Sequence, residues 1–288
     1  MTATTGTGHE RSGADRPRLR RFIEVTLFWL VWIGLGEVLG LGTSAGEIET
    51  YLLIGVPLVV LFQVFVARRD VRELWVRSAP KIIVRRLTVA VAVAAAIYPL
   101  VELIKSIADS QPASMVIAFL VVTTVGAAAA GYAYGHFRSE TWRYLGLCSL
   151  FVVGYLVASH LLFEGESVFT HPLEAHPDRD IEVFILSLLQ YIPTVFVFEE
   201  VAFRGALDSH LHRPGERHGG WTAACISLLW CLWHAPLFGW DEVDNLIVGM
   251  FVPGIVLSIY WRKSGNLGVS GGAHALNDSV RNAFWGVP

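Results

Sequence analysis

Charged residues interrupt the apolar sequence at "FEEVAFRGALDSHLH", residues 198–212, which directly follows a long apolar run. Glu200 and Arg204 stand four residues apart, so in a helix they would share one face and could form an ion pair. Glu199 is then left without a partner close in sequence. A charge at the centre of a membrane helix costs about 2.5–3.5 kcal/mol on insertion scales, and such residues are therefore candidates for function.

Two further polar clusters interrupt apolar runs. His234 lies within "SLLWCLWHAPLF", and His274, Asn277 and Asp278 lie within "SGGAHALNDSV". Taken singly, the three clusters also have structural explanations: an ion pair near the headgroups, a satisfied core histidine, and a helix end that frays into water. Taken together, a carboxylate, two imidazoles and an amide or carboxyl group have the chemistry needed to activate water against an acyl group.

The segment "HRPGERHGG", residues 212–220, explains how these clusters could meet, because its proline and glycines predict a turn. Glu199 and His234 are nearly equidistant from residue 216, so two antiparallel helices joined there would bring them to the same level. His274 stands eight residues after Asn266, about 12 Å along a helix. We therefore expect all three clusters at one depth, around a pocket that admits water. The histidines of this segment themselves are interpreted as part of a solvated turn.

The elements that must position these residues are membrane helices. Of the 288 residues, 53% are hydrophobic and 16% are charged, and the mean hydropathy is +0.51, outside the usual range of soluble domains. About 20 apolar residues cross the hydrocarbon. Nine apolar runs approach this length: 22–41, 50–66, 87–104, 115–135, 143–163, 181–198, 221–238, 246–261 and 266–284. The fold class is therefore all-α, a polytopic membrane helix bundle of about eight or nine transmembrane helices.

The distribution of charge predicts three regions and an orientation. Residues 1–21 form a polar tail with five arginines, residues 22–180 the N-terminal transmembrane helices, and residues 181–288 the catalytic transmembrane core. The 67–86 loop carries six arginines and a lysine, whereas the 164–180 loop is acidic. Because cytoplasmic loops are rich in Lys and Arg, we expect the N-terminus, the 67–86 loop and the 205–219 turn in the cytoplasm and the 164–180 loop outside.

Small residues predict where helices pack closely, and the positions of the cysteines predict that no disulfides form. Gly268 and Gly272 form a small-residue face just before His274, and Pro236 should end the helix that carries His234. The three cysteines all lie in apolar runs, so disulfides are not expected. The first helix follows an Arg-rich segment without a clear cleavage site and is interpreted as uncleaved. The chain should thus be an integral, multi-pass protein of the plasma membrane.

The order of three motifs resembles the CAAX protease and bacteriocin-processing (CPBP) family, which includes the Ras-converting CAAX prenyl endopeptidases. That family has EExxxR, then an aromatic residue four positions before a histidine, then HxxxN or HxxxD. Here they read "EEVAFR", "WCLWH" and "HALND", and the resemblance covers roughly residues 181–285. Two positions depart from the pattern. Trp230 replaces the more usual Phe, which should change packing more than chemistry, and Asp278 stands where Asn is frequent.

The resemblance implies an intramembrane endopeptidase with a peptide or protein substrate at the membrane, such as a CAAX-type prenylated protein or a peptide precursor. Its partners would be this substrate and the lipid bilayer, and we expect no nucleic acid. The implied catalytic residues are Glu199, Glu200, Arg204, His234, His274, Asn277 and Asp278.

The same resemblance implies a role for each group. Glu199 would be the general base, His234 would help to hold the attacking water, and Glu200 with Arg204 would orient the first glutamate. His274 would face the developing oxyanion together with Asp278 or Asn277. An ionised Asp278 has no proton to donate, so it would have to be protonated or leave that role to His274.

Three alternatives remain open from sequence. Glu199, His234 and His274 could instead bind a catalytic zinc, although HExxH spacing is absent and we favour a glutamate mechanism without a cofactor. The polar clusters could serve a non-catalytic membrane scaffold or bacteriocin-immunity protein. They could also relay protons or metal ions in a transporter. We favour the enzyme over a transporter because the earlier apolar runs are almost free of charge.

Overall fold

The structure is a computed structural model that describes residues 17–41, 44, 46–162, 177–213, 215 and 219–285, without the side chains of 177–180 and 285. In these ranges the chain is helical apart from turns, short extended links and one isolated bridge, which confirms the all-α fold class. The elements are α1 (Arg18–Val38), α2 (Glu47–Leu61), η1 (Phe62–Ala67), η2 (Val71–Leu74), α3 (Arg86–Ala108), α4 (Ala113–Val121), η3 (Val122–Gly126), α5 (Ala127–Gly135), α6 (Ser139–Leu162), α7 (Pro177–Val195), η4 (Val201–Asp208), α8 (Ser209–Leu211), α9 (Gly219–Trp233), α10 (Ala235–Phe238), η5 (Trp240–Glu242), α11 (Val243–Ser264) and α12 (Leu267–Trp285).

Helices long and apolar enough to cross a membrane account for six of the nine expected spans. By length and composition they are Glu47–Ala67, Arg86–Ala108, Ala113–Gly135, Ser139–Leu162, Gly219–Phe238 and Trp240–Ser264. The other three expected spans are helical as well, but α1 and α12 carry too many charged or polar residues, and the apolar part of α7, Ile181–Val195, is shorter. The chain is therefore an integral, multi-pass helix bundle.

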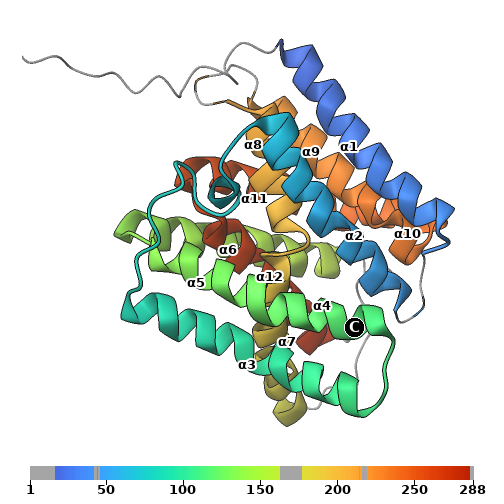
Figure 1. Cartoon of the computed structure of the whole chain (residues 1–288), viewed down its shortest axis with the longest axis vertical. Coiled ribbons are helices and arrows are strands. Elements are labelled where there is room, and N and C mark those ends of the chain that lie inside the picture. The colour runs from blue at the N-terminus through green and yellow to red at the C-terminus, as the bar shows by residue number, and fades with distance from the viewer. Residues whose placement is uncertain are drawn as a thin grey trace, which may run out of the picture.

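The segment from α7 through η4 to α8 runs through the bundle (Figure 1). Its first part, α7, packs against α3 and α5, and its last part, η4 and α8, packs against α1, α2 and α9. Helix α12 packs against α6 and α7, and α11 packs against α9 and α6. Helices from the expected N-terminal and catalytic regions therefore share one core. The polar motifs of α7–η4, α9 and α12 meet inside it.

An aromatic cluster fills the core beside η4. Trp32 stacks on Phe203 and packs edge-on against Trp233, and Tyr51 lies against both tryptophans. The Trp32 indole donates to the Tyr51 carbonyl oxygen at 3.0 Å, and the Tyr51 hydroxyl donates to the Trp233 carbonyl oxygen at 3.1 Å. Large rings thus fill the core on one side of the site, and the polar atoms of Trp32 and Tyr51 remain hydrogen-bonded.

The expected small-residue face on α12 is confirmed. A methyl group at Gly268 would lie 2.6 Å from the Phe137 ring, and one at Gly272 would collide with the Tyr134 hydroxyl. These glycines let α12 approach α5 closely, and so fix the depth of His274. The three cysteines are free, as expected. The 164–176 part of the expected outer loop, and most of the "HRPGERHGG" turn, lie outside the described residues.

Candidate active site

The two adjacent glutamates lie where regular helix gives way to a wider turn. The backbone N–H groups of Val197 and Phe198 both bond to the Thr194 carbonyl oxygen at 3.1 Å, and Glu200 leads into the π-helical segment η4. The Phe196 carbonyl oxygen, freed by this irregularity, accepts the Trp75 indole N–H at 2.9 Å. Segments of π-helix are frequent at functional sites, because they alter which side chains point inward.

Glu199 is contacted by nitrogen atoms from two other helices. Its Oε2 accepts the Trp230 indole N–H at 3.0 Å and lies 3.4 Å from His234 Nε2 and 3.9 Å from His274 Nε2. The side chain keeps 17% of its surface exposed. The three clusters expected from sequence to share one depth therefore do meet, with this carboxylate between them.

Glu200 has a different environment although it is the next residue. Its Oε1 lies 3.0 Å from Arg204 Nη1 and 3.2 Å from His274 Nδ1, and both Glu200 and Arg204 are completely buried. The expected ion pair is thus present. The Arg204 guanidinium also lies over the Trp230 ring, 4.4 Å from its centroid, and donates to the Gly254 carbonyl oxygen at 3.3 Å. Arg204 therefore holds Glu200 and Trp230 in fixed positions.

His234 follows the last residue of α9 and is oriented by its own helix. Its Nδ1 lies 2.8 Å from the Trp230 carbonyl oxygen, one turn earlier. Because a carbonyl oxygen only accepts, Nδ1 carries a proton, and Nε2 is directed at the Glu199 carboxylate. Pro236 lies in the short helix α10 just beyond, as expected for a residue that ends α9.

His274 lies between carboxylates at both ring nitrogens. Nδ1 faces Glu200, and Nε2 lies 3.3 Å from Asp278 Oδ2. A neutral imidazole has only one N–H, so this arrangement is best satisfied by the imidazolium form. His274 and Asp278 do share one helix face, as the spacing predicts.

Asp278 is surrounded by donors, which bears on its expected role beside the oxyanion. Its Oδ1 lies 3.4 Å from Asn277 Nδ2 and 3.7 Å from Arg281 Nη1, and its Oδ2 faces His274. This environment suits an ionised acceptor and leaves donation to His274. Arg281 was not singled out from sequence, although it follows Asp278 by three residues and so shares its face.

Trp230 contacts Glu199 directly. We expected a tryptophan in place of phenylalanine to change packing more than chemistry, but its indole N–H is the closest hydrogen-bond donor to Glu199 among the described residues. A phenyl ring has no such donor. Gly254 makes room for it, since a methyl group there would approach the Trp230 ring to 3.0 Å and collide with the Ser227 hydroxyl. Gly254 could not be found from sequence, because no motif surrounds it.

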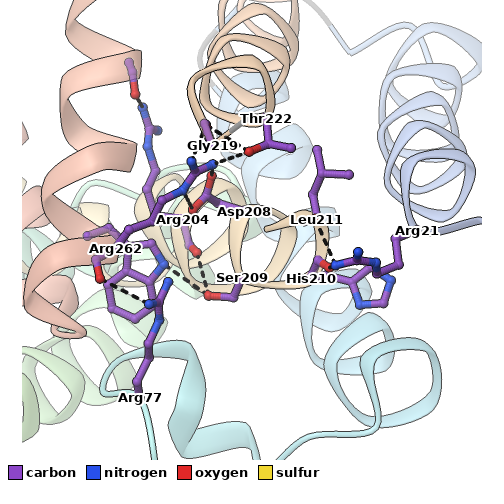
Figure 2. A network of polar contacts seen from close by, with 12 residues as sticks. Arg21, Arg77, Arg204, Asp208, Ser209, His210, Leu211, Gly219, Thr222 and Arg262 are labelled. Atoms are coloured by element: carbon purple, nitrogen blue, oxygen red, sulfur yellow. Dashed lines mark hydrogen bonds and ion pairs between the residues drawn. The ribbon is translucent and has the colours of Figure 1, made fainter. Parts of the chain in front are cut away.

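A second buried polar network lies nearer the end of η4 and was also missed. Asp208 forms an ion pair with Arg262, whose Nε donates to Asp208 Oδ2 at 2.9 Å (Figure 2). Arg262 also donates to the Thr222 hydroxyl at 3.0 Å and to the Gly219 carbonyl oxygen. This network ties η4 to the start of α9 and the end of α11. It joins three elements, and Asp208 at its centre is completely buried.

Metal binding is not evident from the arrangement of ligands. In the part of the chain that the structure describes, no three His, Cys, Asp or Glu side chains form a group suited to a metal ion. Glu199 and His234 each present an atom that could bind zinc, but both nitrogens of His274 face carboxylates. The donors present therefore fit a zinc site incompletely.

Comparison with known families identifies the part of the chain that carries this cluster. Residues 181–280 match the family described as type II CAAX prenyl endopeptidase Rce1-like. This segment belongs to the CAAX protease family. All seven residues expected to be catalytic, together with Trp230 and Gly254, fall within the matched range of this protease family. Comparisons with curated proteins and with solved structures give no match.

Proposed function

We propose that the chain is an intramembrane endopeptidase in which Glu199 activates the water that attacks a peptide bond. The observation that carries this proposal is the contrast between two adjacent carboxylates in a CAAX protease segment. Glu200 is fully buried and paired with Arg204, whereas Glu199 is partly exposed. Its Oε2 is held by Trp230, and its Oε1 accepts no hydrogen bond from any described residue. Glu199 thus has a fixed position and a free acceptor.

A water beside Glu199 would find a second acceptor in His234. In the neutral form of the ring, with its proton on Nδ1, Nε2 would offer a lone pair 3.4 Å from the Glu199 carboxylate. Water has two protons, and it can donate one to Glu199 and one to this nitrogen. Such a water keeps its oxygen lone pairs free to attack a substrate carbonyl.

His274 is the group suited to stabilise the oxyanion. As an imidazolium held by Glu200 and Asp278, it presents positive charge 3.9 Å from Glu199, beside the position of the water. A fixed positive charge beside a developing negative charge acts strongly in a site from which bulk water is excluded, and the Nε2 proton would be shared between Asp278 and the oxyanion. Asp278 then acts through His274, because it accepts the hydrogen bond from His274 Nε2. Asn277 acts one step further away, as a donor to Asp278.

The reaction needs no redox partner and balances with one water. Glu199 takes a proton as the water oxygen bonds to the carbonyl carbon, and the carbonyl oxygen becomes an oxyanion beside His274. Glu199 then gives the proton to the amide nitrogen, the C–N bond breaks, and a carboxylic acid and an amine are released, between which a proton passes in water. The substrate would be a membrane-associated or prenylated CAAX-type protein, or a peptide precursor.

The metal-free mechanism can be tested with the purified chain in detergent and a library of membrane-anchored peptides. Cleavage should survive exhaustive chelation, because Glu199, His234 and His274 supply base, water ligand and oxyanion donor. A zinc enzyme would instead lose cleavage with the metal and regain it on addition. One stoichiometric zinc that disappears in His234→Ala would overturn the metal-free mechanism while retaining the protease. Failure to cleave any library member at any metal content would count against the protease itself.

We further propose that the chain lies in the plasma membrane with its N-terminus in the cytoplasm. The support is the alternation of Lys- and Arg-rich loops with acidic ones, which follows the orientation rule for short loops. Single cysteines in the 67–86 loop, the 205–219 turn and the 164–180 loop can be probed with an impermeant thiol reagent in intact cells. Only the last should react from outside. Labelling of the 205–219 turn would reverse the assignment.

A further inference from the structure

A cavity of about 490 Å³ lies away from the carboxylate cluster, at a level where four helices end. Its lining includes residues at the start of α3, the end of α5, the start of α6 and the end of α11. All four belong to membrane spans, which begin or end at Arg86, Gly135, Ser139 and Ser264. Helix ends gathered at one level mark the boundary between hydrocarbon and headgroups. The cavity is therefore at the height of lipid headgroups.

The lining of this cavity is strongly cationic. Arg77, Arg85, Arg138 and Lys263 line it, against a single acidic residue, Glu140. Arg77 is engaged by the Arg262 carbonyl oxygen and the Trp261 ring. The other three cations are exposed, and within the described part of the chain none of them forms an ion pair, while Lys263 Nζ lies 5.2 Å from the centroid of the Tyr260 ring. Three uncompensated cations around one hollow favour an anionic ligand.

The segment between Pro80 and Arg85 is neither helix nor strand, and it carries exposed apolar side chains that form a border at the edge of the cavity. Ile83 lines the cavity, and the neighbouring Ile82 and Val84 are 65% and 76% exposed. A free anion would gain nothing from this border. A ligand with an anionic head and apolar tails would use both features, because its head can occupy the cavity while its chains lie against the isoleucines and valine. Basic pockets at the ends of membrane helices bind anionic lipid headgroups in this way.

We propose that this cavity binds the phosphate headgroup of an anionic phospholipid. The ligand would bridge elements that already meet there. Val76 pairs with Asn266, the Arg77 N–H donates to the Gly265 carbonyl oxygen at 2.8 Å, and the Leu267 N–H donates to the Trp75 carbonyl oxygen at 2.8 Å. Asn266 lines the cavity and precedes α12, the helix that carries His274. A bound headgroup would therefore brace the start of α12 as well as anchor the chain at the membrane surface.

The test is lipid binding by the full chain, purified in detergent and stripped of lipid, then mixed with phosphatidylglycerol in micelles. Native mass spectrometry would measure the retained lipid, and thermal unfolding would measure stabilisation by it. Arg85→Gln, Arg138→Gln and Lys263→Gln should each weaken binding about fivefold, and together about a hundredfold, because one Lys or Arg near an anionic surface contributes about that much. These side chains are exposed, so the variants should fold.

Arg86→Gln is the matched control, since Arg86 is equally exposed and adjacent to Arg85 but does not line the cavity. It should leave binding within twofold of the native chain. Equal losses in Arg85→Gln and Arg86→Gln, or equal retention of phosphatidylcholine, would overturn a specific site. Equal stabilisation by glycerol phosphate without acyl chains would overturn the lipid as ligand and assign the cavity to a soluble phosphate. None of these readouts depends on peptide cleavage.

Discussion

Two buried polar clusters lie on the same segment, and they are built differently. The inner one surrounds Glu199 and Glu200, and the outer one surrounds Asp208, at the opposite end of η4. Asp208 is matched by a single partner, Arg262, which binds both of its oxygens and also reaches Thr222 (Figure 2). Around Glu199, three nitrogens converge on one oxygen and leave the other open.

We propose that this contrast separates a stabilising cluster from a reactive one. A buried carboxylate whose acceptors are all filled holds elements together and has no capacity left for a ligand. A carboxylate that is fixed through one oxygen and open at the other can take a proton from water without moving. Both clusters are equally polar in sequence, so polarity at membrane depth alone does not identify the site.

The largest expected effect is on cleavage in Glu199→Gln. Glutamine keeps the shape of the side chain and can still accept the Trp230 indole N–H, but it cannot take a proton from water. Cleavage should fall by roughly 10²–10⁴-fold, the usual contribution of a general base, while thermal unfolding stays close to that of the native chain. Single-turnover cleavage of an anchored peptide would measure the loss.

Asp208→Asn is the matched change in the outer network. It should lower the unfolding temperature, because Arg262 loses its charge partner, and should leave the rate per folded molecule nearly unchanged. If Glu199→Gln kept its full activity in cells, the scaffold or immunity function would replace the protease. If Asp208→Asn abolished cleavage by folded protein, the distinction between the two clusters would be wrong.

His274→Ala should have the next largest effect. Loss of one oxyanion donor costs roughly 10²–10³-fold in rate. Because the same change strands Glu200 and Asp278 without a shared partner, some loss of stability should accompany it. His274→Gln retains an N–H donor, so it should cleave faster than His274→Ala. If His274→Gln were more stable than His274→Ala but cleaved no faster, His274 would have a structural role only.

Arg204→Ala and Arg262→Ala should resemble each other in stability and differ in activity. Each removes the cation from a buried pair and strands a carboxylate, at a cost of about 3–5 kcal/mol in the free energy of unfolding. Only Arg204→Ala also releases Glu200 and Trp230, so only it should slow cleavage by the molecules that remain folded. Denaturant unfolding and rates normalised to folded protein would separate the two effects. Equal rates in both variants would contradict the positioning role of Arg204.

The sequence predicted the helical class, the convergence of the three motifs, the Glu200–Arg204 pair and the close approach at Gly272. These follow from spacing along helices, which is local. It did not predict the outer network, because Asp208 and Arg262 are 54 residues apart and no short pattern joins them. Nor could it assign the donor at residues 277 and 278, since the state of Asp278 depends on Arg281 and His274 around it.

The smallest expected effect, and the sharpest test of the inner cluster, is Trp230→Phe compared with Trp233→Phe. The two tryptophans are both buried and lie three residues apart on α9, so each substitution removes a similar amount of packing. Trp230 donates to Glu199, whereas the Trp233 indole nitrogen is buried without a hydrogen-bond partner among the described residues. A hydrogen bond to a charged acceptor contributes about 1.5–3 kcal/mol, so Trp230→Phe should slow cleavage about tenfold or more through misplacement of Glu199. Trp233→Phe should lower stability and spare the rate. Because misplacement of the base acts on the chemical step, the loss in Trp230→Phe should appear in kcat with KM little changed. Equal rates in the two variants would show that the indole contributes only packing, as the sequence first indicated.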